Sequence, residues 1–169
     1  MKLKDHLSGK TNKELIQEIL MFSKKIPSVQ EYYSNRLGKS EDVLAKFKKA
    51  IKEEYFPSRG DGFPQASEIR KLISDFKKIS NSNRDLADLL IFRVEQGVDF
   101  TNEYGDIDEQ FYSSIESSFD AATKLIKKGN LYSEFQERCL KIVEETDGIG
   151  WGFHDCLADL YYETFQNSK

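Results

Sequence analysis

Apolar residues recur along this chain at intervals of three or four, in stretches separated by glycine and proline. The clearest rows lie in residues 43–55, 69–79, 86–98, 111–126, 131–143 and 153–165. This spacing puts the apolar side chains of a stretch on one face of an α-helix. No stretch alternates apolar and polar residues over the length of a strand. The pattern therefore predicts an all-α fold.

Capping signals add helices in the first third of the chain. Thr11 with Glu14, and Ser28 with Glu31, have the spacing of a capping box, in which a hydroxyl and a carboxylate close the start of a helix. We therefore expect about eight helices in successive antiparallel hairpins, forming a bundle or an irregular solenoid-like stack. Residues 1–169 are expected to form a single helical domain.

The charges are unevenly distributed. Residues 1–59 hold 13 Lys and Arg against 8 Asp and Glu, whereas residues 60–169 hold 12 against 21. The N-terminal third is therefore basic and the remainder acidic, which excludes a globally basic nucleic-acid-binding protein. Binding of nucleic acid by the basic third is the weakest hypothesis that we keep.

Composition also restricts where such a chain would work. No apolar run exceeds four residues, so we expect no membrane span. The start of the chain lacks the apolar core of a signal peptide, and two cysteines are too few for a disulfide scaffold. These features favour a cytoplasmic protein.

Three stretches carry a family resemblance. They are residues 69–78, residues 95–109, which include Glu-Gln-Gly-Val-Asp-Phe-Thr-Asn-Glu-Tyr-Gly-Asp, and residues 148–155, which read Gly-Ile-Gly-Trp-Gly-Phe-His-Asp. In this order they resemble a bacterial family known only as a domain of unknown function, over about residues 55–165. The resemblance implies a helical bacterial cytoplasmic protein, and it implies no activity, cofactor or catalytic residue.

Residues 100–109 are an unusual interhelix segment, with four acids beside Asn102, Tyr104 and a glycine. Oxygen-rich loops can bind Ca²⁺ or Mg²⁺, but Ile107 occupies the position at which an EF-hand requires glycine. We therefore expect no metal here. The favoured interpretation is that Asp106 caps the next helix.

Residues 148–155 form a second unusual segment. Its three glycines allow close backbone approach, and Trp151 beside His154 and Asp155 suggests a pocket wall. A metal-dependent hydrolase would need more histidines than the chain has, and no cofactor motif is present. The favoured interpretation is a glycine-rich helix start with a buried Trp151.

The two segments are predicted to lie together. Two helices separate them, and an even number of antiparallel helices returns the chain to the same end. We expect Trp151 near Tyr104 or Phe100, and His154 within reach of an acid of the first segment. The candidate ligand-binding residues are Asn102, Glu103, Tyr104, Asp106, Trp151, His154 and Asp155.

Arg93 falls on the apolar face of its helix. A buried guanidinium needs a carboxylate, and Asp75, at the edge of the preceding apolar row, is the candidate partner. The alternative is that Arg93 extends from the edge of the helix into solvent.

Two functional hypotheses of different classes follow. The leading one is a non-enzymatic protein that binds another macromolecule, such as a protein, through a helix-lined surface, since no catalytic set or cofactor motif is evident. The alternative is an enzyme or small-ligand binder whose pocket joins residues 100–109 to residues 148–155. The sequence does not decide the oligomeric state.

Overall fold

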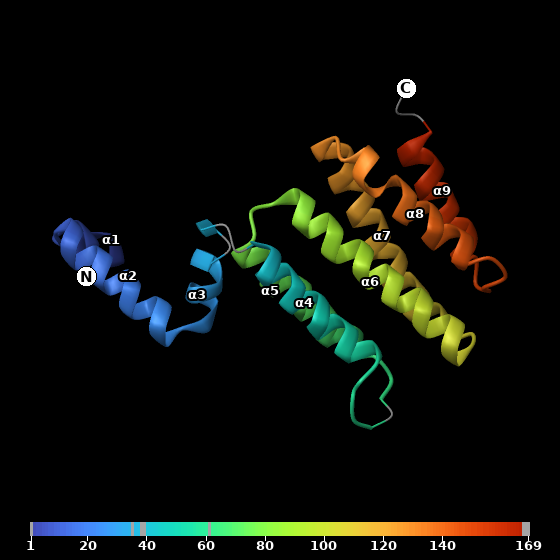
Figure 1. Ribbon diagram of the computed structural model, residues 1–169, viewed down its shortest axis with the longest axis horizontal. Helices are drawn as coiled ribbons and strands as arrows, with labels where there is room; N and C mark the ends of the chain where they lie inside the picture. Colours follow the sequence, from blue (N-terminus) through green and yellow to red (C-terminus); the bar gives the residue numbers. More distant parts are fainter. Residues whose placement is uncertain (1, 35, 38–39, 61, 167–169) are drawn as a thin grey trace.

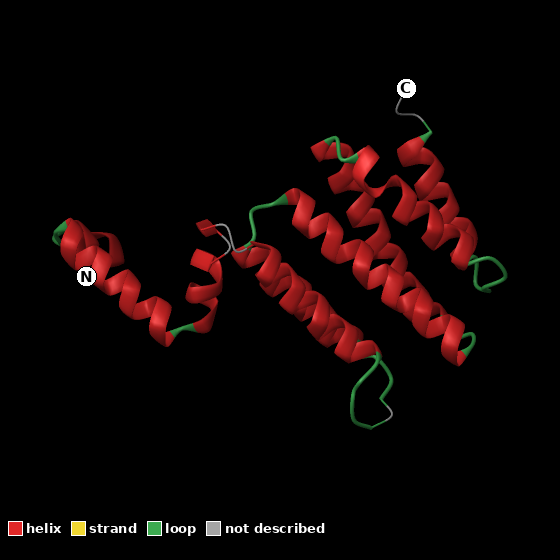
Figure 2. Cartoon of the chain, viewed as in Figure 1, coloured by secondary structure: helices red, strands yellow, loops and turns green. Residues whose placement is uncertain are grey.

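The computed structural model describes residues 2–34, 36–37, 40–60 and 62–166, and the regular secondary structure in this part of the chain is helical (Figures 1 and 2). The prediction of an all-α fold is confirmed. The helices among the described residues are α1 (Leu3–Ser8), α2 (Asn12–Lys25), α3 (Pro27–Ser34), α4 (Ser40–Tyr55), α5 (Ala66–Ile79), α6 (Asn83–Tyr104), α7 (Glu109–Gly129), α8 (Tyr132–Glu145) and α9 (Phe153–Phe165).

The six apolar rows of the sequence correspond to α4 through α9, and the two capping signals to α2 and α3. At α2 the capping box forms as expected, because Thr11 Oγ1 accepts from the Glu14 amide and the Glu14 carboxylate accepts from the Thr11 amide. The box expected at Ser28 is wrong. Helix α3 already begins at Pro27, whose fixed φ suits the first helical position, so Ser28 lies inside the first turn.

Helix α6 is the centre of the fold. It packs against α4, α5, α7 and α8, while α9 covers α7 and α8 (Figure 1). Because neighbours surround it, α6 buries side chains on more than one face, including the polar or charged Asp88, Arg93 and Gln96. Its partners α5, α7 and α8 each bury a single apolar row. This arrangement places Arg93 between helices rather than at the edge of the fold.

An N-terminal arm, formed by α1 and α2, extends away from the other helices, and α3 joins it to α4 and α5 (Figure 1). Helices α1, α2 and α3 bury no residue. Six apolar side chains of the arm and its exit are between 39 and 58% exposed: Ile16, Ile19, Leu20, Met21, Phe22 and Ile26. Among the helices described, none has the length and apolar character needed to cross a bilayer.

Candidate functional site

The two unusual segments predicted to meet do lie against each other. Trp151 Nε1 donates a hydrogen bond to Asp106 Oδ2 at 3.1 Å, and Asn102 Nδ2 donates one to the backbone oxygen of Glu145 at 3.2 Å. Gly150 also approaches Asp106, because a Cβ atom built on Gly150 would lie 3.4 Å from Oδ2 of that carboxylate. The predicted contact between the α6–α7 and α8–α9 connections is therefore confirmed.

The first of these segments is mostly helical, in contrast to the predicted loop. Helix α6 continues to Tyr104, so the connection contains only residues 105–108. The expected role of Asp106 as helix cap is also wrong. Asp108 caps α7 by accepting from the Phe111 amide at 2.8 Å, while Asp106 accepts a hydrogen bond from Tyr112 Oη at 2.6 Å. Asp106 thus fixes the connection to α7 and to Trp151.

The second segment is a glycine-rich helix start, as predicted, since α9 begins at Phe153 and contains His154 and Asp155 in its first turn. His154 Nδ1 lies 3.0 Å from the buried Thr146 Oγ1, a partner from the end of α8 rather than from an acid of the first segment. The expectation that Trp151 is buried is wrong: it is 58% exposed, lies in the connection with a φ of 62°, and its indole reaches Asp106.

The remaining predicted residues point to other neighbours or to solvent. Tyr104 packs on Phe100 with ring centroids 4.7 Å apart, and on Phe56 at 6.4 Å. Glu103 and Asp155 are exposed. The structure therefore joins Asp106 to Trp151, and Asn102 to the backbone of Glu145, as structural contacts, and a binding role for the seven residues stays a prediction.

A different site lies between α5, α6 and α7. A groove of about 570 Å³ runs between α5, α6 and α7, and we call it the Arg93 groove. Its lining contains three cationic side chains, five serines and no acid. The lining residues are Arg70, Ile73, Ser74, Lys77, Leu90, Arg93, Gln110, Ser113, Ser114, Ser117, Ser118 and Ala121.

Arg93 is only 4% exposed and is held by hydroxyl groups rather than by a carboxylate. Its guanidinium donates to Ser118 Oγ, and to Ser114 Oγ at 2.6 Å. The Nε atom is buried without a hydrogen-bond partner among the described residues. The prediction that Arg93 is buried is confirmed, and the alternative that it extends into solvent is wrong.

The predicted pairing of Arg93 with Asp75 is wrong. Asp75 instead forms an ion pair with Lys78 at 2.7 Å. Successive residues of a helix are rotated by about 100°, so Ser74 and Lys77 of α5 face the groove while Asp75 lies on another face, towards α3 and α4. The ion pairs that arginines form among the described residues belong to Arg84 and Arg138, which leaves Arg93 without a counter-charge.

Arg138, in contrast to Arg93, has its charge compensated by carboxylates. From α8 it donates to both carboxylate oxygens of Glu95 at 2.8 and 2.9 Å, and to Asp88 at 2.6 Å. Burial raises the pKa of Asp88, but hydrogen bonds from Lys48 and Arg138 outweigh it and lower the pKa below the ordinary value. Helix α6 thus directs Asp88 and Glu95 towards α4 and α8, and Arg93 towards α7.

The walls of the Arg93 groove carry further unpaired cations. Arg70 and Lys77 line it from α5, and neither forms an ion pair with another described residue, whereas their neighbours Lys71 and Lys78 pair with Glu68 and Asp75. Behind the groove, burial raises the pKa of Tyr55, and the nearby Arg93 lowers it in part. The electrostatic character of the groove is therefore positive.

The serine hydroxyls complete the donor set. Ser114 and Ser118 accept hydrogen bonds from Arg93, and within the described part of the chain neither hydroxyl has an acceptor for its own proton. A hydroxyl that accepts from a cation is left with its O–H to donate. The groove therefore offers cationic N–H and neutral O–H donors together, as an anion requires.

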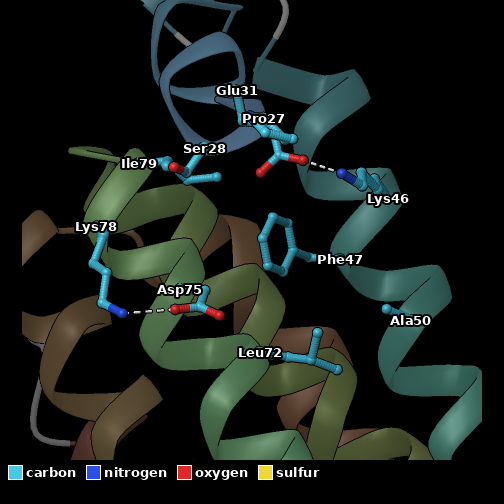
Figure 3. Close-up of a pocket in the computed structure, with 10 residues that line it drawn as sticks. All are labelled: Pro27, Ser28, Glu31, Lys46, Phe47, Ala50, Leu72, Asp75, Lys78 and Ile79. Carbon is cyan, nitrogen blue, oxygen red and sulfur yellow. Dashed lines mark hydrogen bonds and ion pairs between the residues drawn. The ribbon is translucent and has the colours of Figure 1, made fainter. Parts of the chain in front are cut away.

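Two other cavities lack this character. One of about 470 Å³ lies between α3, α4 and α5 with Phe47 and Leu72 in its lining, and its charges are already paired, Lys46 with Glu31 and Lys78 with Asp75 (Figure 3). The other, of about 490 Å³, is lined mainly by aromatic rings, including Tyr104. Neither leaves a buried charge uncompensated.

The spacing of serines in the sequence could have indicated this groove, which the spacing of apolar residues alone did not. Four serines of α7, at positions 113, 114, 117 and 118, repeat with helical spacing beside the apolar row of that helix. Serine is neutral to unfavourable inside helices, so a repeated pair marks a polar stripe facing a specific neighbour. Read together with the buried Arg93, it indicates a hydroxyl-lined surface. No cluster of three or more potential metal ligands occurs among the residues that the structure describes.

Fold and site thus define an all-helical protein with a buried, uncompensated arginine beneath an open groove. The family model described as "Family of unknown function (DUF6155)" matches residues 1–165, and the chain belongs to this family. The match extends over the N-terminal arm, beyond the stretch from about residue 55 that the sequence resemblance covered. No curated protein and no solved structure matches the chain.

Proposed function

We propose that this protein binds a small anionic ligand in the Arg93 groove. The observation that carries the proposal is the Arg93 guanidinium, which is 4% exposed and has no carboxylate partner in the described part of the chain. Burying a charge costs roughly several kcal/mol of folding free energy unless a counter-charge or a full set of hydrogen bonds stabilises it. A bound anion supplies both.

The shape of the groove supports a small ligand. Its volume of about 570 Å³ lies within the range of small-molecule sites. Ile73, Leu90 and Ala121 add apolar surface beside the polar donors, so the lining can contact both an anionic group and an organic portion. The site differs in place from the pocket predicted at residues 100–109 and 148–155.

Isothermal titration calorimetry at low ionic strength tests the proposal with inorganic phosphate, sulfate and acetate as probes. We expect at least one anion to bind the wild type, with affinity reduced about 10- to 100-fold in Arg93→Met, because hydrogen bonds to charged groups contribute about 1.5–3 kcal/mol. Methionine fills a similar volume without a charge, so the variant should fold, which circular dichroism checks.

The matched control is Lys71→Ala, which removes a cation from the outer face of α5. It should bind the probe like the wild type. Absence of binding by all three anions, or equal affinity in Arg93→Met and wild type, would exclude the proposed function.

A second candidate function, binding to another protein, rests on the N-terminal arm. Helix α2 buries no residue and exposes an apolar row that includes Ile16, Ile19 and Leu20. A helix of this length is marginal in water unless an apolar face packs on something. We propose that the row packs into an apolar groove of a partner protein.

Site-specific photo-crosslinking in cells tests this candidate. A photoreactive residue at Leu20, on the apolar row, should give one discrete cross-linked species, while the same residue at Gln17 should not. A species of the same mass from the purified chain would identify the partner as a second copy. Equal cross-linking from both positions, or none, would refute a specific interface.

A further inference from the structure

Resting on the proposed function, we infer that the ligand of the Arg93 groove carries a phosphomonoester group with two negative charges. A single carboxylate fits the same groove less well. Charge balance, the number of hydrogen-bond donors and the arrangement of the two walls each favour the phosphoryl group.

Charge balance comes first. Arg70, Lys77 and Arg93 give the lining three positive charges, and no acid lines the groove. A monocarboxylate would neutralise one of them. A phosphomonoester carries about −1.5 to −2 at pH 7 and so compensates more of the positive charge. The buried Arg93 and a cation on the wall can then share one ligand.

The donors also outnumber what a carboxylate can accept. Ser114 and Ser118 have free O–H groups, and Ser74 and Ser113 line the groove from opposite walls. A carboxylate has two oxygens lying in one plane, whereas a phosphoryl group presents three oxygens on a tetrahedron. Three oxygens can meet donors from α5, α6 and α7 at once.

The two walls run along the groove as facing rows. On α5 the row is Arg70, Ser74 and Lys77, spaced i, i+4 and i+7, so its cations lie about 10 Å apart along the helix axis. On α7 the row comprises the paired serines at 113 and 114 and at 117 and 118. The rows place a cation towards each end and hydroxyls between them, with Arg93 from α6 beneath.

The lining argues for a small molecule rather than a nucleic acid. Proteins that follow a single strand stack its bases on aromatic side chains, and no Phe, Tyr or Trp lines the Arg93 groove. The aromatic rings of this part of the fold line a separate cavity, around Phe63 and Phe100. A compact phosphomonoester is therefore the class that the groove fits.

The experiment compares glycerol phosphate with glycerate, two three-carbon ligands that differ in the anionic group, by calorimetry on the full chain. We expect glycerol phosphate to bind at least about tenfold more tightly, because of the additional charge-assisted hydrogen bonds. In Arg70→Ala/Lys77→Ala the preference for glycerol phosphate over glycerate should fall by about fivefold or more, as expected for the loss of two exposed cations. The matched control Lys71→Ala/Lys78→Ala, which removes two cations of the same helix outside the groove, should retain it.

The pH dependence gives a second readout. The groove lining contains no His, Asp or Glu, and burial raises the pKa of Tyr55 behind it, so a change in affinity between pH 5.5 and 7.5 reports the ligand. Because the second pKa of a phosphomonoester is about 6, glycerol phosphate should bind more tightly at the higher pH. Glycerate affinity should stay constant.

The outcomes separate the two proposals. Equal or tighter binding of glycerate or of malonate, a dicarboxylate, would overturn the phosphoryl assignment while leaving anion binding in place. The same conclusion follows if Arg70→Ala/Lys77→Ala keeps the full preference. If neither ligand nor inorganic phosphate binds the wild type, or if Arg93→Met binds all of them unchanged, the proposed function itself fails.

Discussion

Trp151 Nε1 and Tyr112 Oη donate hydrogen bonds to opposite oxygens of the Asp106 carboxylate, at 3.1 and 2.6 Å. The backbone amide of Ile107 in turn donates to Tyr112 Oη at 3.1 Å. One acid therefore joins the α6–α7 connection, helix α7 and the α8–α9 connection. Burial and the hydrogen bond to Asp106 both raise the pKa of Tyr112, which keeps its hydroxyl a donor.

Removing Asp106 should destabilise the fold more than removing the indole donor. Trp151→Phe loses one exposed hydrogen bond and should cost about 0.5–1.5 kcal/mol of unfolding free energy, whereas Asp106→Ala loses two and should cost about 1–3 kcal/mol. Urea denaturation followed by circular dichroism measures both. Glu103→Ala, an exposed acid of α6, should be neutral. Equal stability of Asp106→Ala and wild type would contradict the role of this carboxylate.

The sequence predicted the helices and the contact between their connections, because both depend on short-range rules. Apolar rows set which stretches are helical, and the parity of intervening helices set which end each connection occupies. The choice of Asp106 as cap failed because two acids, Asp106 and Asp108, precede α7 within three residues. Only the backbone path decides which one reaches the Phe111 amide.

Such short-range rules could not predict the surroundings of Arg93. Its partners come from α7, and their identity depends on the rotation of three helices about their own axes. A shift of one residue on α5 exchanges Ser74 for Asp75 at the groove, because each residue turns the helix by about 100°. Side-chain periodicity predicts that a face is buried, and it does not predict which neighbouring face it meets.

Gly97 of α6 packs closely against Ile115 of α7. A Cβ atom at this position would lie 2.4 Å from Ile115 Cδ1 and 3.0 Å from Ile115 Cγ1. Overpacking typically lowers the unfolding free energy by about 1–3 kcal/mol, whereas the higher helix propensity of alanine over glycine raises it by about 1 kcal/mol. We expect Gly97→Ala to lower the unfolding free energy by about 1 kcal/mol.

Ile115→Val removes the Cδ1 atom and so tests whether the contact with Ile115 is what requires glycine at position 97. On its own it should cost about 0.5–1.5 kcal/mol. Combined with Gly97→Ala, the total loss should be smaller than the sum of the two single losses, since the added methyl group then fills the space. Additive losses in a double-mutant cycle would show that the contact with Ile115 is not what requires glycine.

The network of Arg138, Asp88 and Glu95 predicts sensitivity to acid. Because the pKa of Asp88 is lowered in the folded state, its contribution to stability is present above the ordinary value of 3.8 and is lost as the pH falls below it. The unfolding free energy of the wild type should therefore fall more steeply between pH 5 and pH 3 than that of Asp88→Asn. Parallel curves for the two proteins would contradict this.

Arg138→Met should lower stability at pH 7, because it removes the ion-pair partner of Glu95 and leaves Asp88 paired with Lys48 alone among the described residues. Loss of one partner of a buried pair costs about 3–5 kcal/mol, and partial exposure of Arg138 reduces this to about 1–3 kcal/mol. Lys141→Met, on the same helix with an exposed i, i+4 pair, is the matched control and should change little.

The two free cysteines should differ in reactivity. Burial raises the pKa of the Cys139 thiol to about 12, and that of the half-buried Cys156 is raised by burial and by the nearby Glu116. Only the thiolate reacts with a disulfide reagent, so at pH 8 Cys139 should react more than about a hundredfold slower than an ordinary thiol. The native protein should show one slow reaction, that of Cys156, which is abolished in Cys156→Ala and retained in Cys139→Ala. Denatured, unreduced protein should show two thiols, and a fast reaction of Cys139 in the native state would contradict the closed packing of α8 against α6 and α9.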